Sequence, residues 1–181
     1  MEASLLAGWE NFYVITGSAA GGLTGLTFVV IALIVDARGV APSGLRAFVT
    51  PTIVHFAGVL ALSAYLSMPH QHVITLSLGF GVAGAAGLIY GAVIAANMHG
   101  HPGYTPVRED WVFNVIMPTV LYGCLLALAV LVWRRPTQTM YAGAALLLNR
   151  LFIGIHNAWD IAVWVTLHRR REPPNGGERE G

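Results

Sequence analysis

Five polar residues interrupt the last long hydrophobic segment of the chain, and their side chains are the ones best suited to chemistry. The segment covers residues 140–167 and contains Asn149, Arg150, His156, Asn157 and Asp160. An ionised Arg or Asp at the centre of a membrane helix costs about 2.5–3.5 kcal/mol on insertion scales. Such side chains usually face a bundle interior, a water-filled cavity or one another. The pattern therefore predicts an intramembrane polar cluster.

A helical conformation would put these five side chains on one stripe. At about 100° per residue they fall within roughly a third of the circumference. His156 and Asp160 are four residues apart, so the carboxylate can contact the imidazole. Arg150 lies about 15 Å along the helix from Asp160, which is too far for a direct pair. We therefore expect Arg150 to bind a group on another segment, a backbone carbonyl or water.

His55, in the second hydrophobic segment, is a sixth candidate member of the cluster because we expect it at a depth comparable to that of His156 and Asp160. Three interpretations remain open. The cluster is a buried network that sets helix register, a pathway on which His156 and Asp160 exchange protons, or a haem site. In the last case His55 and His156 would be the two axial ligands. No other cofactor, and no catalytic or metal-binding residue, is predicted.

Composition indicates that these residues belong to a membrane protein. Of the 181 residues, 55% are hydrophobic and only 10% are charged, whereas soluble domains average about 25% charged residues. A membrane span needs about 20 mostly apolar residues, and five stretches qualify: 12–35, 49–68, 73–97, 112–133 and 140–167. We expect an all-α fold, a single transmembrane helical bundle of residues 1–168, and a disordered polar tail of residues 169–181. Pro118 should kink the fourth span.

The placement of arginine predicts the orientation of this bundle. With five spans, one side of the membrane holds Arg38, Arg46, Arg108, Arg169, Arg170, Arg171 and Arg179, and the other holds Arg134 and Arg135. The positive-inside rule then puts the N-terminus outside and the C-terminus in the cytoplasm of a cell whose membrane the chain crosses several times. The net charge of +1 is too small to indicate a nucleic-acid partner.

Small residues recur every four positions in two of the spans. The first span contains Gly17, Gly21 and Gly25, and the third contains Gly79, Ala83, Gly87, Gly91 and Ala95. Small residues at this spacing let membrane helices approach closely. Both ladders are predicted helix-packing surfaces. They pack within one monomer or face a second subunit, so a homo-oligomer or a larger membrane complex remains open.

The opening of the chain resembles that of a group of small bacterial integral membrane proteins of unknown function. The resemblance rests on WENFY at residues 9–13, Gly17, LTGL at 23–26 and FVV at 28–30, with a looser match at IHNAWD, residues 155–160. It implies the same multi-span architecture and no particular activity.

The function that these features favour is a proton or ion channel or transporter that uses the intramembrane polar cluster. The alternative is a non-catalytic structural or regulatory subunit of a membrane assembly. An enzyme with a soluble substrate is less favoured, because no loop is long enough to form a pocket of its own.

Overall fold

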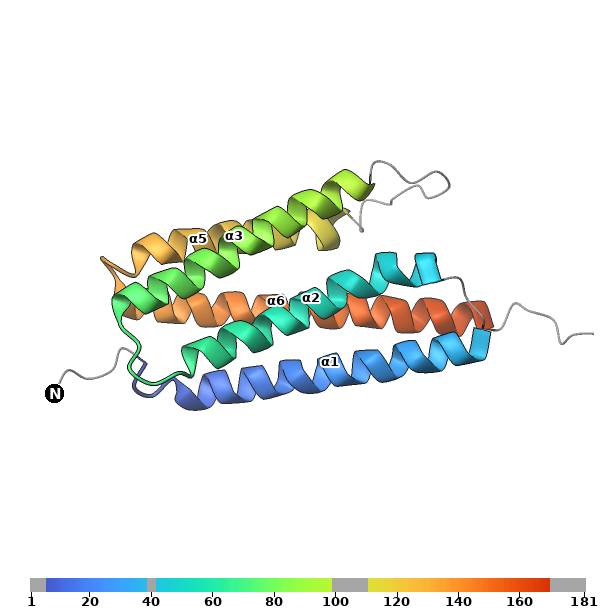
Figure 1. The fold of residues 1–181 in the computed structure, drawn as a ribbon, viewed down its shortest axis with the longest axis horizontal. Coiled ribbons are helices and arrows are strands. Elements are labelled where there is room, and N and C mark those ends of the chain that lie inside the picture. Colours follow the sequence, from blue (N-terminus) through green and yellow to red (C-terminus); the bar gives the residue numbers. More distant parts are fainter. Residues whose placement is uncertain (1–5, 39–41, 99–110, 170–181) are drawn as a thin grey trace, which may run out of the picture.

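All the elements of the computed structural model, which describes residues 6–38, 42–98 and 111–169, are helices. In chain order they are α1 (Glu10–Arg38), α2 (Pro42–Leu66), α3 (Val73–Met98), the π-helix η1 (Val112–Ile116), α5 (Met117–Leu131) and α6 (Pro136–Arg169). They run side by side, up and down the bundle (Figure 1). The expected all-α class is therefore confirmed for the described residues.

Two helix pairs and one long helix make up the bundle. α1 packs mainly on α2, and α3 packs mainly on α5, while α6 packs against α2 and, less extensively, α5. α2 and α3 are consecutive in the chain but share few contacts. The start of α1 and the end of α6 lie at opposite ends of the bundle (Figure 1). The tight turns that join α2 to α3 and α5 to α6 lie at the same end as the start of α1.

Three helices are long and apolar enough to cross a membrane within the described part of the chain. They cover Glu10–Ala32, Val73–Ala96 and Val112–Leu131. The apolar part of α2, Thr50–Leu66, is shorter. α6 has 34 residues but is interrupted by the polar side chains that the sequence singled out. Length and apolarity thus support a membrane protein with three such helices.

Two helices begin earlier than the hydrophobic stretches from which spans are predicted. α2 begins at Pro42 and α6 at Pro136, where the hydrophobic stretches alone placed the starts at residues 49 and 140. Proline is favoured in the first turn of a helix, because its missing N–H would have no partner there in any case. Consequently most of the loop expected at residues 36–48 is helical.

Pro118, where the sequence predicts a kink, lies next to a change of helix type. The segment is divided into the π-helix η1 and the α-helix α5, and Pro118 lies in the first turn of α5. Proline cannot donate the backbone hydrogen bond to the residue four positions earlier. π-Helices are rare and occur mostly as single turns inside α-helices.

The two glycine ladders pack differently. Gly17 and Gly21 face Ser63 and Leu60 of α2, so most of the first ladder packs within the chain, whereas a Cβ at Gly25 would meet no atom within 4 Å. On α3, Gly79 lies beneath the ring of Tyr65 and Gly87 beneath that of Tyr122, and Gly91 lies near Thr119. α3 also meets α5 at Gly84, which belongs to neither ladder and faces the backbone at Leu126 and Tyr122.

Candidate functional site

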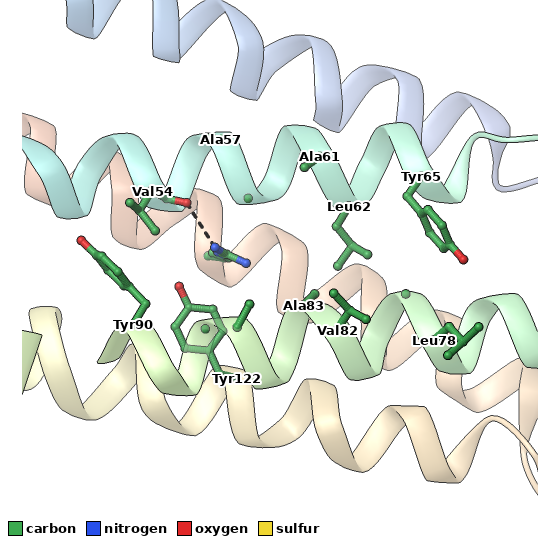
Figure 2. A pocket seen from close by; sticks show the side chains of 15 residues that line it. Val54, Ala57, Ala61, Leu62, Tyr65, Leu78, Val82, Ala83, Tyr90 and Tyr122 are labelled. Carbon is green, nitrogen blue, oxygen red and sulfur yellow. Dashed lines mark hydrogen bonds between the residues drawn. The ribbon is translucent and has the colours of Figure 1, made fainter. Parts of the chain in front are cut away.

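A groove separates α2 from α3 in the middle of the bundle. It forms a cavity of about 600 Å³. Its walls are mainly small and apolar side chains, with tyrosines at both ends (Figure 2). The residues that line it include Val54, Gly58, Ala61, Tyr65, Leu78, Gly87, Tyr90, Tyr122 and Arg150. The groove exists because small residues of α3 face α2 while α3 packs closely on α5 instead.

Arg150 extends from α6 to the wall of this groove. Only 6% of the residue is exposed. Its Nη2 donates a hydrogen bond of 3.1 Å to the backbone carbonyl oxygen of Val54 on α2. The guanidinium carbon lies 4.8 Å from the centroid of the Tyr122 ring on α5, a cation–π distance. Arg150 therefore finds its partners on other helices, and one of them is a backbone carbonyl, as expected.

A glycine on α2 makes room for the guanidinium group. A Cβ added at Gly58 would overlap Nη1, Nη2 and Cζ of Arg150. No other residue type could stand at position 58 while Arg150 keeps this conformation. The absence of a side chain at Gly58 thus decides where the positive charge lies.

Several polar atoms around the groove have no hydrogen-bond partner among the described residues. They are Nε of Arg150 and the hydroxyl oxygens of Tyr90 and Tyr122. Among the described residues, an ion pair joins His156 and Asp160. No carboxylate of the described residues pairs with Arg150. A buried charge is normally paired or fully hydrogen-bonded. The groove therefore contains a cation that is incompletely satisfied.

The groove is polar at one end and apolar at the other. Tyr90 and Tyr122 lie at the end marked by Val54, whereas Tyr65 and Leu78 lie at the opposite end (Figure 2). At that opposite end the Tyr65 hydroxyl already donates a hydrogen bond of 2.9 Å to the carbonyl oxygen of Thr75. The unsatisfied donors therefore gather at one end only.

His55 is buried on α2, next to the residue whose carbonyl binds Arg150. It is 3% exposed, and its Nδ1 has no hydrogen-bond partner among the described residues. No group of three or more His, Cys, Asp and Glu side chains that could hold a metal ion occurs in the same part of the chain. The haem hypothesis, with His55 and His156 as ligands, stays a prediction.

A second polar group joins α6 to η1, beyond Arg150 along α6. Asn157 Nδ2 donates to Asn114 Oδ1 at 3.4 Å. The His156 ring lies over the Phe113 ring, with 3.8 Å between centroids. Nε2 of His156 is 3.2 Å from Oδ2 of Asp160, and these two side chains are 33% and 58% exposed. The expected contact between residues four apart is therefore confirmed.

The five polar residues of α6 differ in their burial. Arg150 and Asn157 are buried, whereas Asn149 and Asp160 are exposed and His156 is half-buried. Asn149 donates to the carbonyl oxygen of Ala145 on its own helix, at 2.8 Å. A stripe that covers a third of a helix is wide enough for one edge to face the bundle and the other to face outward.

No protein-family model, curated protein or solved structure matches this chain. The groove and its buried cation are therefore the features from which a function has to be inferred.

Several lining residues of the groove were not predicted as site residues, Tyr90 and Gly58 among them. Tyr90 stands in an otherwise apolar part of α3, and a hydroxyl in such a segment is a signal that could have been used. Gly58 carries no signal of its own, because its role depends on a guanidinium group 92 positions away in the chain, and only the packing of α6 on α2 brings the two together.

Proposed function

We propose that this chain is a multi-pass membrane protein that binds an amphiphilic molecule, taken from the bilayer, in the groove between α2 and α3. The observation that carries the proposal is the buried guanidinium group of Arg150, which lines an apolar cavity and has no carboxylate partner among the described residues. Ligand sites in proteins are mostly apolar cavities of about 300–1,000 Å³ with a few polar groups that fix orientation. The groove has this character.

The proposal includes a bundle of five spans, with the N-terminus outside and the C-terminus in the cytoplasm. The burial of Arg150 and Asn157 supports the inclusion of α6, because these side chains turn away from the lipid. Arg150 lies about 20 Å along α6 from Pro136, which is inside a hydrocarbon core about 30 Å thick. An amphiphile would therefore reach the groove from within the bilayer.

A photoreactive long-chain alcohol tests this function, because it has the apolar chain of an amphiphile without its charge. At saturating concentration we expect it to label residues of the groove in the wild-type protein. Ala61→Phe puts a ring into the groove from an exposed position, so labelling should fall at least fivefold. The matched control is Ala64→Phe, which adds the same ring at an exposed position of α2 outside the groove.

Equal labelling of Ala61→Phe and the wild type would contradict the proposal. Equal losses in both variants would contradict it too, since labelling would then depend on the state of α2 and not on the groove. Thermal unfolding of both variants in the same detergent checks that each is folded.

Proton or ion movement is the second candidate, and the contact of 3.2 Å between His156 and Asp160 favours it. A carboxylate beside an imidazole is a suitable relay for protons. Both side chains are partly exposed, and neither residue lines the groove. A function of this kind would need a path that continues from it to both membrane faces.

Asp160→Asn distinguishes the two candidates. If the protein conducts protons, liposomes that contain the wild type should acidify under a proton gradient, and Asp160→Asn should lower this rate at least tenfold. Glu10→Gln is the control. It makes the same change of carboxylate to amide at the start of α1, where the Glu10 carboxylate accepts a hydrogen bond from the nearby Gly8 N–H. An absence of flux in the wild type would eliminate this candidate and leave the binding function intact.

A further inference from the structure

We infer that the ligand of the groove is a long-chain carboxylate, held with its anionic head at Arg150 and its chain along α2 and α3. The inference rests on the proposed binding function and specifies the chemical class of the ligand. It follows from the charge in the groove, the positions of the free hydrogen-bond donors and the shape of the apolar part.

The charge requires an anion. Arg150 is nine-tenths buried, and its Nε has no hydrogen-bond partner among the described residues. The fork of donors on a guanidinium group matches the two oxygens of a carboxylate. One hydrogen bond to a carbonyl and one aromatic ring leave part of that fork unused. A neutral headgroup would not neutralise the charge, whereas a carboxylate would.

The two free hydroxyl groups point to the same kind of head. Tyr90 and Tyr122 lie at the polar end of the groove, and their hydroxyl oxygens have no partner in the described chain. Phenol hydroxyls donate readily to a carboxylate oxygen. A carboxylate bound by Arg150 would give these donors an acceptor, so the three side chains form one recognition group.

The remainder of the groove fits one acyl chain. From Val54 to Tyr65 the wall of α2 extends about 17 Å. Along this length the lining side chains are apolar, and the hydroxyl at the far end, that of Tyr65, is already bonded to Thr75. A cavity of about 600 Å³ between two helices suits one chain better than a diacyl lipid with its phosphoryl head. The groove therefore favours a free fatty acid as its ligand.

Competition for a photoreactive palmitate tests the inference on the full-length protein in phosphatidylcholine nanodiscs. Unlabelled palmitate should compete at least tenfold better than hexadecanol, which has the same chain and no charge. Dipalmitoyl phosphatidylglycerol, an anion with two chains, should compete less well than palmitate. A diazirine near the end of the chain should label the groove close to Leu78, far from Tyr90.

Variants of the recognition group complete the experiment. Arg150→Met should abolish the preference for palmitate over hexadecanol. If that variant does not fold, the double variant Tyr90→Phe and Tyr122→Phe keeps both rings and removes the hydroxyl donors, and it should lower the preference at least threefold. The neutral control is Ala64→Phe, which should keep the full preference.

The outcomes separate the two proposals. Equal competition by palmitate and hexadecanol, with labelling still lost in Ala61→Phe, would overturn the carboxylate and leave amphiphile binding in place. Stronger competition by phosphatidylglycerol would overturn the single-chain acid in favour of a lipid headgroup. Labelling that Ala61→Phe does not reduce would remove the groove itself, and both proposals with it.

Discussion

Arg150→Glu is expected to destabilise the folded bundle by about 3–5 kcal/mol, the usual cost of an uncompensated buried charge. The reason is the chemistry of the two groups that the Arg150 guanidinium contacts in the wild type. The Val54 carbonyl oxygen and the face of the Tyr122 ring both carry negative charge density, and both would face a carboxylate. An SDS titration of the protein from mild detergent, followed by circular dichroism, measures the change.

Arg150→Met is the matched control, with a flexible apolar side chain and no charge. The Arg at the centre of a membrane helix costs about 2.5–3.5 kcal/mol on insertion scales. A hydrogen bond to a charged group returns about 1.5–3 kcal/mol, and a cation–π contact about 0.5–2 kcal/mol. These contributions nearly cancel, so we expect Arg150→Met to lie within about 1 kcal/mol of the wild type. A loss as large as that of Arg150→Glu would mean that the positive charge itself holds the helices together.

Gly84→Ala should weaken the contact of α3 with α5 by about 1–3 kcal/mol, the usual cost of overpacking. A Cβ at this position would lie 2.8 Å from the backbone nitrogen of Leu126 and 2.9 Å from the carbonyl oxygen of Tyr122. Backbone atoms of a packed helix cannot rotate away as the end of a side chain can. The two helices would have to separate, and the same SDS titration would report the loss.

Gly25→Ala provides the comparison, because a Cβ there would meet nothing within 4 Å. Alanine is a better helix former than glycine by about 1 kcal/mol, so the variant should be as stable as the wild type or slightly more stable. A marked loss in Gly25→Ala would be informative, since it would indicate that another molecule, such as a second copy of the chain, covers this part of α1.

The proposed ligand explains why an arginine stands in the groove although the bundle gains little stability from it. Polar groups inside a membrane are expensive, and those found there commonly serve a function. Among the described residues, one carbonyl and one ring contact the guanidinium group. A bound carboxylate would supply the opposite charge, so binding and not folding is the event that this residue favours.

The sequence by itself determined the all-α fold class and the approximate positions of the long apolar helices. Long apolar segments with few charges can satisfy their backbone groups in a membrane only as helices or closed barrels, so the all-α bundle followed from composition and segment length. The contact of His156 with Asp160 also followed, because it depends on two residues about one helical turn apart.

Only the tertiary structure decided how the polar residues are used. Spacing along α6 put Asn149, Arg150 and Asp160 on one stripe, but whether each faces the bundle or the outside depends on how α6 is rotated against α2 and α5. The groove depends on the same packing, since Gly58, Tyr90, Tyr122 and Arg150 come from four different helices. Side-chain periodicity is a local property of one helix, whereas the rotation and separation of helices result from the contacts of all of them together.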